Sequence, residues 1–177
     1  MCAARMRKSS GKTPALVGAE TLQIRHCGGN DLLQVREVLK RAPEAADWSE
    51  DSLREFFFHY GSSFLVACKG PEIQGFICGR RIIDEVEILN LAVRPEVRRK
   101  GIANRLVREF LEQIARHGVR MVHLEVRESN QGAIGLYASN GFRVTGRRRG
   151  YYRDPKEDAI LMARDVNAVT GANDSTV

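Results

Sequence analysis

Two side chains in the second half of the chain have the types and positions that proton transfer requires. Glu125 lies in a run of alternating apolar residues, so we expect it on the polar face of a strand, beside His123. Tyr137 falls in a short predicted helix, and a phenol with a pKa of about 10 can donate a proton while staying neutral at physiological pH. Glu125 is our candidate for a general base acting through water, and His123 is a weaker one. The ordinary alternatives are a solvated edge glutamate and a buried core tyrosine.

A second chemical signal is a basic helix start. Arg98, Arg99 and Lys100 stand where the partial positive charge of a helix N-terminus normally attracts acidic residues. Gly101 removes a Cβ from the approach to the backbone, and Ala103 keeps the next turn small. Consecutive amides in such a turn suit a phosphate or pyrophosphate. The alternative is a solvated basic helix start with an incidental glycine.

A strand and a helix are needed to hold this turn. Residues 86–93 form a short run of Val, Ile and Leu that ends at Arg94-Pro95, and this predicts a strand because proline cannot donate to a ladder. From near Arg98, apolar residues recur at the spacing of one helical face, and Gly118 is a common helix stop. The apolar positions are Ala103, Leu106, Val107, Phe110, Leu111 and Ile114.

The remaining elements complete one domain of helices and strands. Residues 22–26 predict a first strand, and Ser49 is a good N-cap for a helix that runs through Phe58. The expected order is strand, two helices, three antiparallel strands, helix, strand, helix and two strands. The other elements are a helix over 32–39, strands over 63–69, 73–83 and 119–126, a short helix from Ser129 or Asn130 to Asn140, and strands over 142–151 and 158–165.

Length and composition indicate a single globular domain. The chain has 177 residues, of which 43% are hydrophobic and 28% charged. We expect a folded domain over 21–166, a disordered basic arm over 1–20 and a flexible tail over 167–177. The sequence has neither an apolar run of about 18 residues nor a secretory signal, so we expect a cytoplasmic protein without a membrane partner.

Charge and cysteine content limit the partners. The net charge of +6 and the pI of 9.4 favour anionic partners, and both a nucleotide-bearing cofactor and a ribonucleoprotein qualify. The run Arg147-Arg148-Arg149 is either solvated or in contact with ribosomal RNA. The cysteines lack C-x-x-C spacing and paired histidines, so we expect no metal and no disulfide framework. They are Cys2, Cys27, Cys68 and Cys78.

The basic turn resembles a known family signature. Arg98-Arg99-Lys100-Gly101-Ile102-Ala103 matches the Q/R-x-x-G-x-G/A motif of the GNAT superfamily of N-acetyltransferases, and it follows a strand as it does in that family. The resemblance implies an α/β (α+β) GNAT fold, with a mixed, mostly antiparallel seven-stranded sheet that is splayed between strands four and five. It also implies acetyl-coenzyme A as co-substrate and no metal. The residues implied to bind it are Leu91, Ala92, Val93, Arg98, Arg99, Lys100, Gly101, Ile102, Ala103, Asn104, Asn130 and Tyr137.

Four further blocks resemble one branch, the RimI-type ribosomal-protein-alanine N-acetyltransferases. They are the segments 89–93, 124–130, 133–142 and 148–160, which contain L-N-L-A-V, L-E-V-R, L-Y before N-G-F, and R-R-G-Y-Y. The resemblance implies Glu125 as base and Tyr137 as acid. The implied acceptor is the N-terminal alanine of a small-subunit ribosomal protein, gripped by Trp48, Asn90, Glu125, Tyr151 and Tyr152.

Residue chemistry is compatible with that acceptor. An α-amino group has a pKa of about 7.7 to 8.0, against about 10.4 for lysine, so an N-terminal amine needs only modest help from a carboxylate. None of the cysteines falls in the motifs, which favours direct attack in a ternary complex. Trp48 and the two tyrosines are equally suited to ordinary core or hairpin pairs.

The sequence departs from the branch pattern at Asp47, where proline is common, at Gly150, where asparagine is common, and in the basic arm. These departures concern the acceptor and not the cofactor. Alternative functions are therefore acetylation of other protein N-termini or of a small-molecule amine. An alternative of another class is a non-catalytic module of the same fold that binds coenzyme A or RNA.

Overall fold

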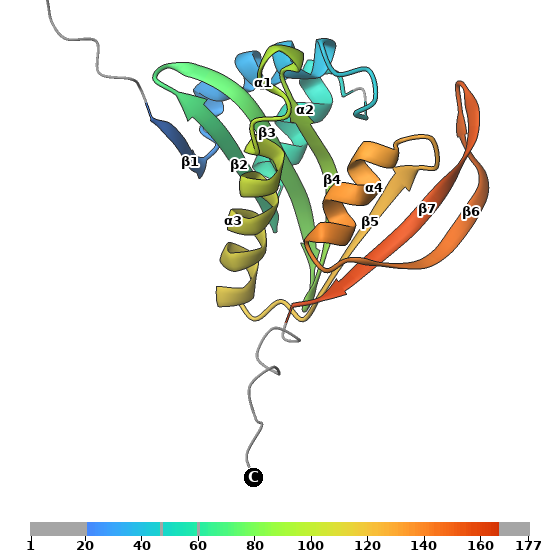
Figure 1. The fold of residues 1–177 in the computed structure, drawn as a ribbon. Helices are drawn as coiled ribbons and strands as arrows, with labels where there is room; N and C mark the ends of the chain where they lie inside the picture. Colours follow the sequence, from blue (N-terminus) through green and yellow to red (C-terminus); the bar gives the residue numbers. More distant parts are fainter. Residues whose placement is uncertain (1–20, 47, 60, 167–177) are drawn as a thin grey trace, which may run out of the picture.

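The computed structural model describes residues 21–46, 48–59 and 61–166. The predicted basic arm over 1–20, the predicted tail over 167–177, Cys2 and Asp47 lie outside the described residues. Helices flank one seven-stranded sheet (Figure 1). The elements are β1 Leu22–His26, α1 Leu32–Lys40, α2 Glu50–Phe58, β2 Ser62–Lys69, β3 Glu72–Ile82, β4 Glu85–Val93, α3 Ile102–Arg116, β5 Met121–Arg127, α4 Gln131–Ser139, β6 Arg143–Arg153 and β7 Lys156–Asp165, with 3-10 turns at Gly29–Asp31 and Pro95–Val97.

The sheet confirms the predicted α/β fold and its splay. The strand order is β1-β2-β3-β4-β5-β7-β6, and every neighbouring pair is antiparallel except β4 with β5. The parallel register runs only from Glu85 with Met121 to Ile88 with Leu124. Beyond this point the two strands diverge, so the edge of β4 that faces β5 is open over 89–93.

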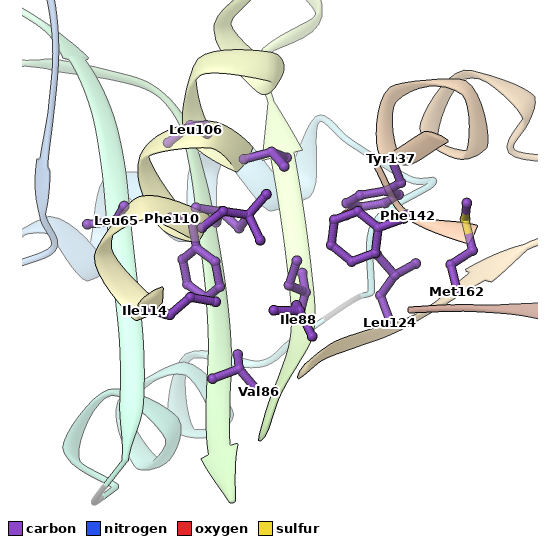
Figure 2. Packing of buried hydrophobic residues seen from close by; sticks show 14 of the residues in the cluster. Leu65, Val86, Ile88, Leu106, Phe110, Ile114, Leu124, Tyr137, Phe142 and Met162 are labelled. Atoms are coloured by element: carbon purple, nitrogen blue, oxygen red, sulfur yellow. The ribbon is translucent and has the colours of Figure 1, made fainter. Parts of the chain in front are cut away.

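Two hydrophobic clusters cover opposite faces of the sheet. On one face α3 and α4 contribute Leu106, Phe110 and Tyr137, and Figure 2 shows Tyr137 lying with Phe142 beside Leu124. On the other face α1 and α2 pack side chains such as Val35. Because consecutive strand residues point to opposite faces, both faces of the central strands are covered, and β2 and β3 are continuously buried over 64–68 and 73–79.

A bulge changes which side chains β4 presents to each face. Cys78 of β3 pairs with Asn90 and Gly79 pairs with Ile88, so Leu89 is an extra residue on β4. Ile88 before the bulge and Leu91 after it both pack on the α3 side, although an offset of three positions would put them on opposite faces of a regular strand. Asn90 therefore points towards α1 and α2, where its amide donates to the carbonyl of Ala46 over 2.9 Å.

The start of α3 differs from the prediction. The helix begins at Ile102 and not near Arg98, because the Arg98 backbone is extended, with φ −62° and ψ 165°. The Arg98 side chain fixes this conformation by donating to the carbonyl of Val93 over 3.1 Å and pairing with Glu44 over 2.5 Å. Residues 98–101 thus form a loop before the helix. No helix in the described part of the chain is both long and apolar enough to cross a membrane.

Candidate functional site

Glu125 lies where β4 and β5 part. It is the first residue of β5 beyond the last pair with β4, while on its other edge it still pairs with Leu161 of β7. Along β5 the side chains of Val122, Leu124 and Val126 are buried and those between them are partly exposed, which confirms the predicted face of Glu125. Its carboxylate is therefore on the sheet face opposite α3 and α4.

The Glu125 side chain is held by two residues of β6. The Arg148 Nη1 atom lies 2.8 Å from Glu125 Oε1, and the Glu125 side chain is 17% exposed. A hydrogen bond to Glu125 raises the pKa of the Tyr151 hydroxyl, because the carboxylate favours the neutral phenol. The sequence prediction placed Tyr151 with Glu125, but it assigned Arg148 only to a solvated or RNA-binding run.

Tyr137 lies on the other face of the sheet, in the wall of the α3 and α4 cluster. Burial raises its pKa well above the ordinary value, because the ionised phenol would lose its hydration. Its ring meets Phe142 edge to face, with centroids 5.4 Å apart. Ala133 precedes it by one helical turn, so both side chains share one face of α4.

A groove of about 330 Å³ runs between β4, α3 and α4, beside this face of α4. Its apolar floor is the open edge of β4, its basic end is the loop before α3, and Glu44 lies at its rim. Lys100 and Tyr137, which the sequence also assigned to the cofactor, are not in its lining. The lining residues are Glu44, Leu91, Ala92, Val93, Val97, Arg98, Arg99, Gly101, Ile102, Ala103, Asn104, Asn130, Gly132, Ala133 and Leu136.

The loop before α3 is shaped to receive an anion. Arg99 and Gly101 both have left-handed backbones, with φ of 64° and 78°, and an added Cβ on Gly101 would meet nothing within 4 Å. Within the described structure no side chain caps α3, so its first amide N–H groups remain available. Arg99 and Lys100 are exposed beside them. These features fit a phosphate or pyrophosphate group.

Two asparagines at the groove have structural partners. The side chain of Asn130 accepts from the amide of Ala133 over 3.1 Å, so it caps α4, which was one of its two predicted roles. Asn104 accepts from Asn140 Nδ2 over 2.8 Å, and this bond ties α3 to α4. Asn104 and Asn140 also line a larger hollow, of about 1020 Å³, between α3, the end of α4 and the strands β6 and β7.

Only some of the residues predicted to bind the acceptor contact one another. Tyr151 and Tyr152 contact each other edge to face on β6, and the Arg127 guanidinium lies over the Tyr152 ring. Trp48 packs instead on Phe56 of α2, with ring centroids 5.1 Å apart. No aromatic contact within the described residues joins Trp48 to the tyrosines. Nor do these residues gather three or more histidine, cysteine or acidic side chains in a group that could hold a metal.

Residues 32–142 match the Acetyltransferase (GNAT) family. The chain belongs to this family. It is 33% identical over 141 residues to the ribosomal protein bS18-alanine N-acetyltransferase of Escherichia coli (strain K12), covering 77% of this chain and 93% of that protein. The crystal structure of the ribosomal-protein-S18-alanine N-acetyltransferase from Escherichia coli superposes with a TM-score of 0.76 at 28% identity, over 89% of this chain and 99% of that one.

Two other similar proteins extend the comparison. The N-alpha-acetyltransferase RimI of Mycobacterium tuberculosis (strain ATCC 25618 / H37Rv) is 46% identical over 87 residues, which is 49% of this chain and 53% of that protein. The structure of Arabidopsis thaliana NAA60 in complex with acetyl-CoA shares the fold, with a TM-score of 0.74 at 22% identity over 83% of this chain and 99% of that one. The GNAT chain described here is thus an N-acetyltransferase.

Sequence reasoning missed contacts that involve the arginines of β6. Arg147 pairs with Glu128 and, over 3.2 Å, with Asp158, while Arg148 pairs with Glu125. These two members of the run are therefore engaged within the protein and not simply solvated. The predicted contact of the run with ribosomal RNA gains no support from these pairs and stays a prediction.

Proposed function

We propose that this acetyltransferase transfers the acetyl group of acetyl-coenzyme A to the α-amine of an N-terminal alanine on a small-subunit ribosomal protein. The supporting observation is the parting of β4 and β5, with Glu125 on one face of the sheet and Tyr137 on the other. A thioester lying in such a gap is reached by an amine from one face and by a proton donor from the other. The names of the Escherichia coli relatives supply the acceptor.

Acetyl-coenzyme A would lie in the groove between β4, α3 and α4. The amides over 99–104, with Arg98, Arg99 and Lys100 around them, would hold the pyrophosphate. The open edge of Leu91, Ala92 and Val93 would pair with the pantetheine amides, as an added strand does. Ile102, Ala103, Asn104, Asn130 and Tyr137 complete the proposed cofactor residues. When bound, the cofactor supplies an activated acyl carbon on a thiolate leaving group.

Glu125 would act as base. The acceptor amine attacks in its neutral form, and Glu125 accepts, directly or through a water molecule, the proton that the nitrogen loses once it has bonded to the acyl carbon. The amine needs only a modest base because its pKa is about 7.7 to 8.0. The hydroxyl of Tyr151 and the guanidinium of Arg148 fix the carboxylate on the acceptor side of the sheet.

Tyr137 would act as acid. Its phenolic proton passes to the sulfur as the carbon–sulfur bond breaks, and burial keeps that proton in place until then. Cys27, Cys68 and Cys78 do not line the groove, which agrees with direct transfer and no acyl-enzyme. The acceptor chain would run over the same face as Glu125, between Trp48 and the Tyr151-Tyr152 pair, with Asn90 holding the connection from α1 to α2 in place.

The test is acetyl transfer from acetyl-coenzyme A, followed by thiol release, to a peptide that begins with alanine and to its twin blocked at the α-amine. We expect release with the free peptide alone. Release with neither peptide, while acetyl-coenzyme A still binds, would reject the proposed acceptor. Equal release with both would place the acetyl group on a side chain or on water.

A wider range of N-termini is the second candidate. It is favoured by the similarity to the Mycobacterium tuberculosis N-alpha-acetyltransferase, whose name specifies no single target. A panel of peptides that differ only in their first residue separates the two. Strict dependence on alanine supports the ribosomal acceptor, and comparable rates with several first residues support the wider range.

A further inference from the structure

Arg148 and Tyr151 reach the same carboxylate although they stand three positions apart on one strand. In a regular strand, residues at that spacing point to opposite faces of the sheet. Yet Arg148 Nη1 lies 2.8 Å from Glu125 Oε1, and Tyr151 is hydrogen-bonded to the same side chain. The Arg148 guanidinium also lies over the Tyr151 ring, 5.5 Å from its centre. The three side chains therefore form one contact group.

A bulge in β6 makes this convergence possible. The register pairs Arg148 with Ala159 and Tyr152 with Glu157, so β6 advances four residues while β7 advances two. Gly150 takes a left-handed backbone with φ of 57° at this point. Its amide donates to Asp158 Oδ1 over 2.8 Å, which anchors the bulge to β7. The strand is built irregularly where it meets Glu125.

The ion pair is poorly suited to a role in stability alone. The Arg148 side chain is 57% exposed, and ion pairs with such exposure are screened by solvent and contribute little to folding. The Glu125 side chain is much less exposed and stands at the end of the β4–β5 pairing. The contact acts mainly on the direction of the carboxylate, since a glutamate has several rotatable bonds to restrict.

We propose that Arg148 is a positioning residue for acetyl transfer, holding the Glu125 carboxylate together with Tyr151 in the orientation that accepts the proton of the acceptor amine. The inference rests on the proposed function, in which Glu125 is the base. Arg148 occupies one carboxylate oxygen, and a carboxylate has further acceptor sites for an amine or a water molecule. Arg148 itself takes no proton, because a guanidinium stays charged.

The test is a double-mutant cycle on kcat for the alanine peptide. Arg148→Ala is expected to lower kcat about tenfold, because misplacing a catalytic group costs about this much or more, and to leave the KM for acetyl-coenzyme A unchanged. In a Glu125→Gln background the same substitution is expected to change kcat by less than about twofold, since it acts through Glu125. Arg148→Lys should recover part of the loss, as it keeps a cation near Oε1.

Arg149→Ala is the matched control. Arg149 is the neighbouring arginine on the same exposed strand and makes no ion pair among the described residues, so kcat should stay at the wild-type level. An equal loss from Arg148→Ala in both backgrounds, an unchanged kcat in the single variant, or a raised KM for acetyl-coenzyme A would overturn the inference. A wild-type protein that acetylates no free peptide rejects the proposed function itself, and the positioning role with it. If the wild-type protein is active but the effects of Arg148→Ala and Glu125→Gln on kcat are additive, only the positioning role is rejected.

Discussion

Ile88 and Leu124 are the last residues that β4 and β5 pair, and Glu125 follows Leu124 directly. The parting of the strands therefore begins beside the proposed base. The groove assigned to the cofactor lies on the α3 and α4 side of the sheet, and the Glu125 carboxylate assigned to the acceptor lies on the other.

On the acceptor side, Glu125→Gln is expected to lower kcat by about a hundredfold or more, the usual contribution of a general base. The affinity for acetyl-coenzyme A should stay nearly constant, because Glu125 is not part of the groove. Steady-state kinetics and direct cofactor titration measure the two quantities. Wild-type turnover in this variant would remove Glu125 from the mechanism.

On the cofactor side, Tyr137→Phe should slow turnover by about tenfold to a hundredfold with little change in stability, since the ring contact with Phe142 is kept. Burial raises the pKa of Tyr137, so the protonated acid persists as pH rises. The wild-type rate should therefore increase as the acceptor amine loses its proton, at pH of about 8, and stay level to about pH 10. A decline between those values would contradict the acid role.

The two glycines that bracket α3 offer a matched comparison. Gly101 and Gly118 have φ of 78° and 74°, and an added Cβ at either would meet nothing within 4 Å. Each change to alanine should therefore cost a similar amount of stability, about 1 to 2 kcal/mol, from left-handed backbone strain. Only Gly101→Ala should also weaken acetyl-coenzyme A binding. Equal affinities in the two variants, measured by titration, would argue against a pyrophosphate at the loop.

The bond between Asn104 and Asn140 should contribute to stability. Asn140 is 8% exposed and its amide donates both to Asn104 and to the carbonyl of Leu136. Asn140→Ala should lower the free energy of unfolding by about 1 to 3 kcal/mol, because it leaves the side-chain oxygen of Asn104 without this donor. Urea unfolding measures this loss. Ser139→Ala is the control, since the Ser139 hydroxyl bonds the same carbonyl at an exposed position and its removal should cost little.

The ion pair of Asp31 with Arg25 should make the folding stability of the protein decrease in acid. The Arg25 guanidinium, hydrogen-bonded to Asp31 over 2.5 and 2.9 Å, holds the pKa of that carboxyl below its usual value. A pKa lowered in the folded state means that the stabilisation is present above the unfolded-state value of about 3.9 and is lost as pH falls through the folded-state value. Asp31→Asn should destabilise the protein at pH 7 by about 1 kcal/mol or less and flatten the decline in acid. Identical midpoints of urea unfolding for the variant and the wild type at pH 7 would contradict this.

Periodicity was sufficient to predict the order of the elements and the faces of β5 and α3, because apolar side chains there follow a regular spacing. Periodicity predicts the start of α3 too early, because contacts outside the helix decide that boundary. The Arg98 side chain bonds the Val93 carbonyl at the end of β4 and the Glu44 carboxylate, which is far away in the sequence. The contact of Arg148 with Glu125 could not be predicted from periodicity either, because it also depends on tertiary structure. Three consecutive arginines look equivalent until the bulge at Gly150 directs one of them to the carboxylate.

The extra residue in β4, Leu89, determines which face of the sheet each following side chain of the strand points to. Removing Leu89 would exchange the faces of the next residues, so Asn90 and Ala92 would turn towards α3 and the larger Leu91 and Val93 towards α1 and α2. Both clusters would then carry the wrong volumes, and Asn90 would lose the Ala46 carbonyl. The number of residues in this strand is therefore as strictly constrained as their identities, and length variation in this protein belongs in its loops.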